Sequence, residues 1–542
     1  MRAVLEVVIQ ELNQHICNTT HTEYTLLTSR NVMDTQSSLV SSSVLREEAE
    51  YNRPVVVSSS RLGTVTDLWS QRSPYDRRAL NIGIVHFGPG RFFRGHLARI
   101  IHNYLAQKGS QEQRWGICGV SLKSRRAINT LGRQRFLYTL IERYSCAENR
   151  ESAEVIGSIR EIVDGRDDRD YVLEKMTSPS VHLVTLTVTQ GGYHLDKSFN
   201  LDTANEEIVH DMRNPSTPTT AIGFIVEALR RRRDRGVAPF TILSCDNLPR
   251  NGETLRRAVL TYADLINPGL AAYIRNNATF PNTVVDRIVP QEHESHYNYP
   301  CRLLQVQDRS PIVTEPFWQF VVEDNFRGDR PCWEDTGVIM TKDITPFLYL
   351  KSRFLNAVHS FIACLAVRAG IEYMHEALKL PEFQLFTPLL MSDIPAATPV
   401  PRQMCEQYIS QVLLRLSNEA LPDSIERIST ETLRKVGKYI FPILDDAYSR
   451  KASIRRLILP IAAWILAVRE GATEGGKPYD AKESVSVVTA IQEGALLSQI
   501  MGLENSELKQ VVDDEFHQAM LVLQTQGLLT TLKNYSEGAQ LR

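Results

Sequence analysis

Residues 81–93 read Asn81-Ile82-Gly83-Ile84-Val85-His86-Phe87-Gly88-Pro89-Gly90-Arg91-Phe92-Phe93. An apolar strand runs directly into a glycine turn, and a helix with an apolar face follows over residues 97–105. A dinucleotide-binding turn requires this order, because glycines let backbone amides and the amino end of a helix approach a pyrophosphate. The motif is weak when taken alone. Methyltransferases and many other nucleotide-binding proteins also contain a strand, a Gly-x-Gly turn and a helix.

The alternation of strands and helices continues beyond this turn. Strand-like runs occupy residues 115–122, 136–143, 154–163, 181–189 and 240–247, and helix-like segments occupy residues 167–176 and 221–233 and begin again at Gly252. This spacing predicts a doubly wound α/β sheet, with ligand groups at the carboxyl ends of its strands. Asn247 stands at such an end. The arginines that end residues 221–233 suit the negative end of a helix dipole, and we expect them to be solvated rather than to form an anion site.

The pattern changes near Thr345. From there most segments have helical period, over residues 348–368, 402–416, 424–436, 454–470, 484–497 and 506–525. We therefore expect a Rossmann-like domain that binds a nicotinamide dinucleotide over residues 76–343 and a mostly α-helical substrate and catalytic domain over residues 344–542. Residues 1–75 contain several serine runs, which predict a poorly ordered extension.

Composition limits the class of protein. The chain has 542 residues, 43% of them hydrophobic and 23% charged, which is typical of a soluble globular protein. The formal net charge of −2 gives no reason to expect a nucleic-acid partner. The eight cysteines are scattered without zinc-site spacing, so we expect no metal and a reducing compartment, the cytoplasm. No signal pattern and no membrane-length apolar run is present. Without coiled-coil heptads, a monomer is the default expectation.

The first helical segment of the second domain is unusually polar on one side. It contains Lys351-Ser352-Arg353-Phe354-Leu355-Asn356-Ala357-Val358-His359-Ser360. At about 100° per residue, Asn356 lies roughly 140° and His359 roughly 80° around the helix from Lys351, so the three side chains share one broad face. Together they offer a proton carrier, a hydrogen-bond donor and an orienting group. The alternative is a solvated helix edge with a histidine in the core.

Six motifs occur in the order typical of one family. They are Gly88-Pro89-Gly90-Arg91-Phe92-Phe93-Arg94-Gly95-His96, Thr187-Val188-Thr189-Gln190-Gly191-Gly192-Tyr193, Ser244-Cys245-Asp246-Asn247 with Asn251-Gly252, residues 280–290, Thr314-Glu315-Pro316-Phe317, and residues 351–360. Together they resemble the polyol-specific long-chain dehydrogenase/reductase family. That family includes mannitol 2-dehydrogenases and the hexuronate reductases that act on fructuronate and tagaturonate. The resemblance covers roughly residues 75–535.

The resemblance implies a metal-independent hydride transfer between the nicotinamide C4 and the C2 carbon of an open-chain polyol or 2-ketose. Lys351 matches the general acid/base, and burial must depress its pKa if it is to accept a proton near neutral pH. Asn247 and Asn356 match the asparagines that donate hydrogen bonds to the oxygen gaining alkoxide character. The catalytic set is completed by His359, which matches a position that orients the substrate.

Three further positions match substrate-binding residues of the family. They are Asp286, Arg427 and Lys435. Between Arg427 and Lys435, the small Asp-Gly-Ser linker of the family is replaced by Glu431-Thr432-Leu433. The alternative interpretation of Asp286 is a surface ion pair with Arg287.

The resemblance also implies where the dinucleotide binds. The matching positions are Phe87, Gly88, Pro89, Gly90, Arg91, Phe92, Lys123, Arg125, Thr189 and Asn247. Phe93 replaces the usual histidine of the family, and we expect the loss of a polar group beside the phosphate turn to alter cofactor affinity. After the second strand, where an acidic side chain would favour NAD, the chain has Lys123-Ser124-Arg125-Arg126. A basic cluster accommodates a 2′-phosphate, so we predict that NADP is tolerated or even preferred. NAD is the family default, and the alternative interpretation of the cluster is solvated arginines at a helix start.

The leading hypothesis is therefore an NAD- or NADP-dependent, mannitol-2-dehydrogenase-like enzyme that acts on a polyol or ketose. A hexuronate reductase is the near alternative, because it shares every motif. A non-catalytic nucleotide-binding homologue, whose serine-rich extension recruits a partner, is the third. The constellation of Lys351 with the two asparagines argues against it, since a sensor needs no proton carrier.

Overall fold

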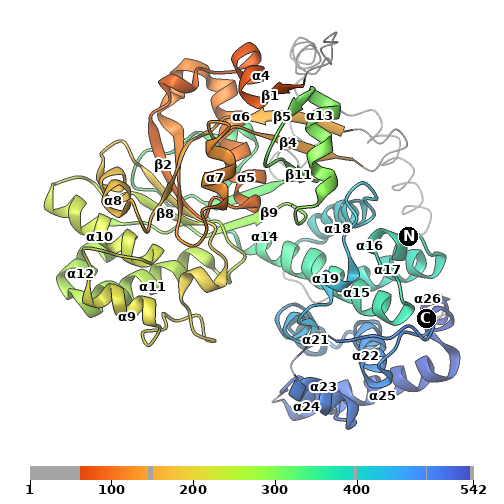
Figure 1. The fold of residues 1–542 in the computed structure, drawn as a ribbon. Coiled ribbons are helices and arrows are strands. Elements are labelled where there is room, and N and C mark those ends of the chain that lie inside the picture. Colours follow the sequence, from red (N-terminus) through yellow and green to blue (C-terminus); the bar gives the residue numbers. More distant parts are fainter. Residues whose placement is uncertain are drawn as a thin grey trace. The chain divides into compact units, whose positions relative to one another are not determined.

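The computed structural model describes residues 62–144, 151–394, 400–481, 483, 485–503 and 505–537. The chain divides into two compact units, residues 1–344 and residues 345–542. We call them the sheet unit and the helical unit (Figure 1). The second unit begins at Thr345, one residue after the start expected for the helical domain.

The centre of the sheet unit is a parallel sheet of five strands in the order β6-β3-β2-β7-β8. Its strands are β2 (Ile82–Phe87), β3 (Gly116–Ser121), β6 (Ile159–Asp164), β7 (Leu183–Leu186) and β8 (Thr241–Ser244). The chain moves outward from β2 to β3 and β6, and then returns to the other side of β2 at β7. This reversal is a topological switch point, where doubly wound sheets bind their ligands.

Both faces of this sheet are buried. Successive strand residues point to opposite sides, so each strand contributes side chains to two cores. Val85, Val120 and Val184 join the core formed with α8 (Arg169–Thr177), α10 (Ala221–Asp234) and α11 (Asn251–Ile266). Ile84, Ile117 and Leu183 join the core on the other face, formed with α6 (Leu97–Lys108) and the smaller sheets. Figure 1 shows α8 and α10 together beside the sheet.

Within the residues that the structure describes, the sheet unit also contains three smaller sheets and several further α-helices. The strands are β11 (Ile312–Thr314), β4 (Tyr138–Arg143) and β5 (Glu151–Ile156) in one sheet, β13 (Ile339–Thr341), β12 (Gln319–Glu323) and β9 (Thr283–Asp286) in another, and β1 (Gly63–Thr64) with β10 (Val306–Gln307) in the third. The remaining helices are α4 (Val65–Arg72), α5 (Arg91–Gly95), α7 (Arg126–Gly132), α9 (Glu206–Arg213), α12 (Pro268–Asn277) and α13 (Asn298–Leu304).

The prediction of a poorly ordered extension is wrong for residues 62–75. Strand β1 pairs in parallel with β10, and α4 begins at a capping box formed by Thr64 and Asp67. Val65 and Tyr75 are buried. These two side chains are buried by contacts with distant parts of the chain. Local composition therefore did not predict that this segment is ordered. Residues 1–61 lie outside the described residues.

The helical unit packs around one long apolar helix. Residues 457–468 of α22 (Arg455–Glu470) are all buried, and α15 (Ala357–Ala369) and α25 (Ser506–Gln526) pack against this helix. The other α-helices in the described part of this unit are α14 (Thr345–Leu350), α16 (Met374–Ala377), α17 (Pro381–Asp393), α18 (Arg402–Leu416), α19 (Ile425–Ile428), α20 (Thr432–Lys435), α21 (Phe441–Ser449), α23 (Val485–Gln492), α24 (Leu497–Ile500) and α26 (Leu528–Glu537), with π-helical turns at Lys351–Asn356 and Val436–Ile440.

Three predicted elements are divided in the structure. Residues 154–163 form the end of β5 and most of β6, because the chain turns at Gly157, where a Cβ would lie 2.4 Å from the ring of Trp69. Residues 424–436 form α19 and α20, which are separated at Glu431 with a left-handed φ of 52°. Residues 484–497 are interrupted after α23 by Gly494, whose φ is +86°. Periodicity alone does not detect such local reversals.

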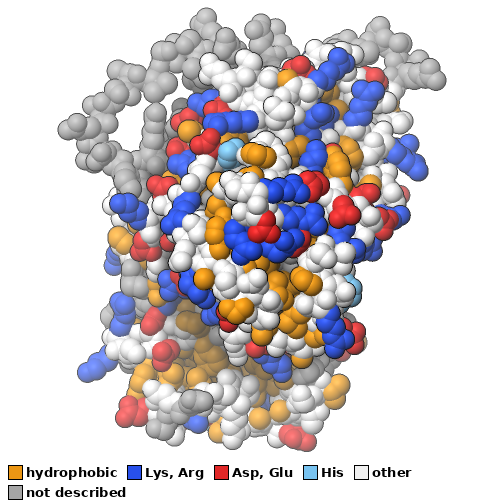
Figure 2. All heavy atoms as spheres, turned by 90° about the vertical axis from the view of Figure 1, so that its left-hand side faces the viewer, with side chains coloured by type: hydrophobic (Ala, Val, Ile, Leu, Met, Phe, Trp, Pro, Cys, Tyr) orange, Lys and Arg blue, Asp and Glu red, His pale blue; other side chains and the backbone are white. Residues whose placement is uncertain are grey.

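The surface carries charges of both signs. Figure 2 shows blue and red side chains interspersed on the face that includes α8 and α10. Arg230 and Arg231 pair with Glu227, and Arg235 pairs with Glu174. These three arginines are therefore paired with carboxylates rather than left as a free cationic site. Among the described residues, no helix combines the length and the hydropathy needed to cross a membrane.

Candidate active site

The glycine turn after β2 is shaped by close backbone contact at the switch point. Gly88 has a φ of +87°, and a Cβ there would lie 2.1 Å from the Thr187 carbonyl oxygen. The Gly90 N–H donates to the Gly88 carbonyl at 2.7 Å, and α5 begins at the next residue. Gly90 itself has a negative φ, and a Cβ there would meet only the Gly88 oxygen, at 3.9 Å. The chain therefore requires glycine at position 88, whereas at position 90 it leaves room.

The buried His86, at the end of β2, forms a hydrogen bond to the backbone of this turn. His86 Nε2 lies 3.2 Å from the Gly88 carbonyl oxygen, and Nδ1 lies 2.7 Å from Thr185 Oγ1. Since a carbonyl only accepts, Nε2 carries the hydrogen. Burial lowers the pKa of His86 to about 3, so the ring is neutral. Phe93 stacks on this ring with a centroid distance of 3.6 Å and is fully buried. Position 93 thus faces the core, and the substitution there removes no polar group from the turn.

Polar atoms without partners lie around the turn. Arg91 donates to the carbonyl oxygens of Pro290 and Pro311 at 3.2 and 3.4 Å, but its Nη2 is buried and has no hydrogen-bond partner among the described residues. The same is true of Thr187 Oγ1. Buried polar groups normally have partners. An anionic group bound at the turn would supply one to Arg91, so these residues fit a dinucleotide pyrophosphate.

The basic cluster after β3 is largely paired with carboxylates. Arg125 contacts Asp164 at 2.8 Å and also contacts Asp167. Arg126 contacts Glu292, again at 2.8 Å. Lys123 is exposed and makes no ion pair with a described residue. The cluster therefore presents less positive charge to a 2′-phosphate than its sequence indicates.

Asp246 organises the loop that follows β7. Its carboxylate accepts hydrogen bonds from the Val188 and Thr189 N–H groups at 2.8 and 3.2 Å and from the Tyr193 hydroxyl at 2.8 Å. Burial raises its pKa, while these three donors act in the opposite direction. Thr189 has a positive φ of 59°. The neighbouring Asn247 is exposed at the carboxyl end of β8, as the sequence predicted.

Asn251 ties the end of β8 to the start of β9. Its Nδ2 donates to the Ser244 carbonyl at 3.1 Å and to Thr283 Oγ1 at 2.8 Å, and its Oδ1 accepts the Thr283 N–H at 2.8 Å. Gly252 follows, where a Cβ would lie 2.4 Å from the Phe280 carbonyl oxygen. The Asn-Gly pair thus sets the spacing of the two strands that carry Asn247 and Asp286.

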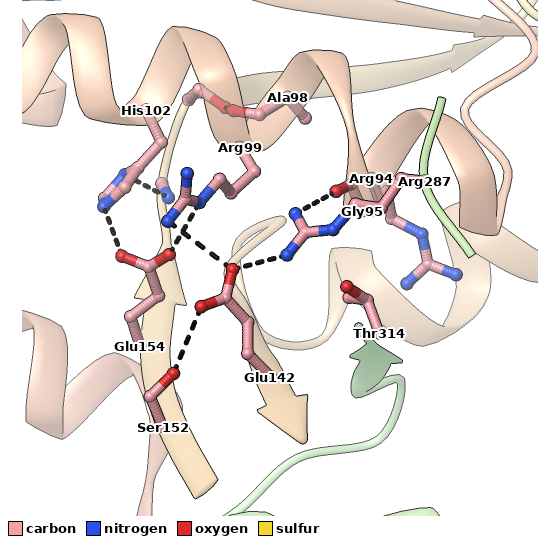
Figure 3. Close-up of polar contacts among 12 residues, drawn as sticks. Arg94, Gly95, Ala98, Arg99, His102, Glu142, Ser152, Glu154, Arg287 and Thr314 are labelled. Carbon is pink, nitrogen blue, oxygen red and sulfur yellow. Dashed lines mark hydrogen bonds and ion pairs between the residues drawn. The ribbon is translucent and has the colours of Figure 1, made fainter. Parts of the chain in front are cut away.

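Asp286 ends β9 and is buried, with 3% of its surface exposed. It is followed by Arg287, whose side chain is fully buried and pairs with Glu142. Figure 3 shows the surrounding network, in which Arg287 Nη1 donates to the Gly95 carbonyl at 2.6 Å and Arg99 lies 3.5 Å from Glu142. The interpretation of residues 286 and 287 as a surface ion pair is therefore excluded. The network fixes the backbone on which Asp286 is carried.

Lys351 and Asn356 are the first and last residues of a π-helical turn between α14 and α15. The Ala357 N–H donates to the Ser352 carbonyl, five residues back. In a regular α-helix, residues five apart point about 140° away from each other, whereas a turn closed by i→i+5 bonds brings them toward one side. Lys351 is 8% exposed, and Asn356 and His359 are half-buried. The solvated helix edge is therefore excluded for the lysine.

His359 and Arg427 share one carboxylate. Asp423 Oδ2 lies 3.2 Å from His359 Nε2, and Asp423 Oδ1 accepts from Arg427 Nε at 2.7 Å. Burial raises the pKa of Asp423, but its contact with His359 and the charge of Arg427 outweigh burial and lower the pKa to about 2. Lys435 donates to the Ile428 carbonyl. Burial and the nearby charge of Arg427 lower the pKa of Lys435. Three predicted site residues of the helical unit thus form one charged cluster.

Among the described residues, no group of three His, Cys, Asp or Glu side chains is arranged to hold a metal ion. The six described cysteines form no disulfide with one another.

Two family models together match most of the chain. The mannitol dehydrogenase Rossmann domain matches residues 82–335, and the mannitol dehydrogenase C-terminal domain matches residues 343–521. The chain belongs to the mannitol dehydrogenase family. A mannitol dehydrogenase of Saccharomyces cerevisiae is 36% identical over 419 residues, which cover 76% of this chain and 82% of the relative.

Two solved structures resemble this family member closely. A D-sorbitol dehydrogenase in substrate-free form is 31% identical with a TM-score of 0.77, over 85% of this chain and 96% of that one. Pseudomonas fluorescens mannitol 2-dehydrogenase, solved as a ternary complex with NAD and D-mannitol, is 30% identical with a TM-score of 0.74, over 88% of this chain and 100% of that one. These comparisons confirm the predicted fold class and the predicted class of enzyme, an oxidoreductase of the polyol dehydrogenase family.

In this mannitol dehydrogenase family member, sequence reasoning missed the carboxylates that hold the site residues. Asp246 stands next to Asn247, so its position at a strand end could have identified it. Glu142 and Asp423 lie far along the chain from the residues they contact, in stretches without a motif. No signal in one sequence would have found them.

Proposed function

We propose that this chain is an NAD-dependent 2-dehydrogenase of polyols that interconverts D-mannitol and D-fructose. The observation that carries the proposal is the π-helical turn with Lys351 and Asn356 at its two ends and His359 in the next turn of helix, in a chain of the mannitol dehydrogenase family. This arrangement combines a buried amine, an amide donor and an imidazole on one element.

Each residue has a role in the proposed reaction. In the direction of polyol oxidation, the neutral Lys351 amine would take the proton of the C2 hydroxyl. Asn247 and Asn356 donate hydrogen bonds to the oxygen as it gains alkoxide character, and they stabilise it without titrating. The nicotinamide, when bound, supplies the hydride acceptor. In ketose reduction the protonated Lys351 returns the proton to that oxygen.

The substrate is held by the remaining predicted residues. Asp286, His359, Arg427 and Lys435 would bind the hydroxyl groups on either side of C2, and polyols offer both donors and acceptors to such a set. The D-sorbitol dehydrogenase relative makes D-sorbitol, the C2 epimer of D-mannitol, a second candidate substrate. A hexuronate reductase would need a cation beside a substrate carboxylate, and Arg427 already binds Asp423 bidentately.

NAD is the cofactor we propose. Residues 87–92 and Thr189 would surround the dinucleotide at the switch point, with Arg91 on the pyrophosphate. The carboxylates that bind Arg125 and Arg126 reduce the attraction for a 2′-phosphate, so we expect NADP to be the poorer cofactor.

The test is an initial-rate assay of the full chain at the reduced-nicotinamide absorbance band. D-fructose, D-fructuronate and D-tagaturonate are each crossed with NADH and NADPH, and D-mannitol and D-sorbitol with NAD. We expect fructose and mannitol turnover with NADH and NAD, and a fall in kcat of about 10²- to 10⁴-fold in Lys351→Ala. The matched control is Lys379→Ala, an exposed lysine paired with Glu419. Cofactor binding without turnover of any sugar would favour a non-catalytic homologue.

A further inference from the structure

The Asp423 carboxylate contacts both His359 and Arg427. Its contact with His359 bears on which ring nitrogen is available to a substrate. An imidazole has two nitrogens, and in the neutral ring one donates and the other accepts. His359 Nε2 is buried and lies 3.2 Å from Asp423 Oδ2. The remaining nitrogen, Nδ1, is the one left for a ligand.

The contact is close but not well aligned. His359 Nε2 has no hydrogen bond of good geometry with any described residue, although the carboxylate oxygen is within ion-pair distance. No other described acceptor competes for this nitrogen. A carboxylate only accepts, so the stable tautomer carries the hydrogen on Nε2, and a small rotation of the ring aligns it.

Asp423 itself is held rigidly. Its carbonyl accepts the Met374 N–H at 3.0 Å, and the next two residues are tied to residues 372 and 373 by the Ile425 N–H bond to Glu372 at 2.8 Å and by an antiparallel bridge. On its other side it is bound by Arg427, whose own N–H donates to the N-cap Ser424 at 3.3 Å. A carboxylate fixed on both sides can fix what it contacts.

We propose that Asp423 is a positioning residue of the active site, which keeps His359 in the Nε2–H tautomer so that Nδ1 accepts a hydrogen bond from a substrate hydroxyl, and which holds Arg427 beside it. The proposal rests on the proposed function for the identity of the substrate, but not for the tautomer. The low pKa of Asp423, about 2, keeps the carboxylate charged throughout the working range of pH.

The first test measures the tautomer directly. In protein labelled with ¹⁵N at histidine, the His359 ring signals are assigned by their loss in His359→Asn. We expect the wild-type ring to be protonated on Nε2, and Asp423→Ala to shift the ring toward a mixture of both tautomers. An unchanged ring spectrum in Asp423→Ala, or a wild-type ring protonated on Nδ1 alone, would overturn the proposal whatever the enzyme's substrate is.

The second test is kinetic and separates positioning from folding. Asp423→Asn is expected to lower kcat/KM for the sugar about 10- to 100-fold, because small displacements of orienting groups have effects of this size. The KM for the cofactor should stay unchanged. Asp393→Asn is the matched control, since Asp393 also binds an arginine bidentately, Arg456 at 2.7 and 2.6 Å. We expect wild-type kinetics from it.

The outcomes separate this proposal from the proposed function. If wild-type protein turns over the sugar and Asp423→Asn does so equally well, the positioning role is wrong and the function stands. If wild-type protein turns over no sugar, the function is wrong, and the tautomer measurement still decides the role of Asp423. If Asp423→Asn raised the KM for the cofactor as much as the KM for the sugar, the effect would be a general structural one, and the proposal would also be overturned.

Discussion

Several of the predicted site residues, or their immediate neighbours, are held by carboxylates from distant parts of the chain. Asp246 orders the loop at Thr189, Glu142 binds Arg287 beside Asp286, and Asp423 binds His359 and Arg427. Hydrogen bonds to charged groups are roughly twice as strong as neutral ones, and buried ones tolerate few alternative geometries. The predicted site residues thus depend on supporting residues that carry no chemistry of their own.

The buried pair of Arg287 and Glu142 gives a prediction about stability. Arg287→Met leaves the Glu142 carboxylate, whose side chain is 3% exposed, without its closest cation, and we expect a loss of about 3–5 kcal/mol in the free energy of unfolding. Chemical denaturation measures it. The control is Arg302→Met, which breaks the pair with Glu151 at an arginine that is 56% exposed, and should cost less than about 1 kcal/mol. Equal losses in the two variants would show that burial of the pair is not the cause.

The buried His102 gives a prediction about pH. Burial lowers its pKa from an ordinary value near 6.5 to about 4, and its Nδ1 accepts from the Tyr75 hydroxyl at 2.7 Å. Below pH 6.5 the unfolded ring binds a proton that the folded ring does not. This contribution to stability is therefore complete above pH 6.5 and is lost as the pH falls toward 4, by about 1.4 kcal/mol per pH unit.

The measurement is the free energy of unfolding at a series of pH values for wild-type protein and His102→Gln. We expect the variant to be less stable at pH 7 but to lose less on acidification. Parallel curves between pH 6.5 and 4 would mean that His102 is not the group responsible.

At the scale of elements, the glycine turn and the π-helical turn matter most. Both depart from regular geometry. At Gly88 the backbone passes close to the Thr187 carbonyl, and the π-helical turn brings the side chains of Lys351 and Asn356 toward one side of the helix. Irregular turns of this kind are frequent at functional sites.

The two glycines of the first turn give a matched pair of variants. Gly88→Ala would place a Cβ 2.1 Å from the Thr187 carbonyl oxygen at a φ of +87°, so we expect a loss of stability and at least about a tenfold weaker NADH affinity. Gly90→Ala has room within the chain, with its nearest neighbour at 3.9 Å. Its stability should match the wild type while NADH affinity still falls, because the added methyl group meets the pyrophosphate. NADH affinity is measured by fluorescence titration. If Gly90→Ala bound NADH as tightly as the wild type, the proposal that the pyrophosphate binds at this turn would be wrong.

At the scale of the whole molecule, the proposed reaction gives one role to two asparagines that lie far apart in the sequence. Asn247 belongs to the sheet unit, and Lys351 and Asn356 belong to the helical unit. If both asparagines act on the same oxygen, their losses are coupled. Asn247→Ala and Asn356→Ala should each lower kcat about 10²- to 10³-fold, and the double variant should lose less than the product of the two.

A double-mutant cycle on kcat measures this coupling. Asn251→Ala is unsuitable as a partner because it would disturb the spacing of β8 and β9, so Lys379→Ala serves as the uncoupled control. Strict additivity of Asn247→Ala and Asn356→Ala would contradict a shared oxygen.

Local patterns along the chain were enough to predict the alternation of strands and helices, the change to helices near Thr345, and the family. Apolar periodicity and glycine spacing are local properties, and motifs such as residues 88–96 are contiguous, so one chain displays them without its fold. The same local evidence failed at residues 62–75 and at Glu431, where order or reversal depends on distant contacts.

The groups that support the site become visible in the folded chain alone. A period of 3.6 residues does not predict the π-helical turn between Lys351 and Asn356, because its backbone hydrogen bonds span five residues rather than four. Asp423 lies 64 residues beyond His359 in the sequence but 3.2 Å from it in the fold. The neutralised arginines after β3 likewise owe their partners to other strands and loops. Charge pairing acts through space, and the sequence records only the order along the chain.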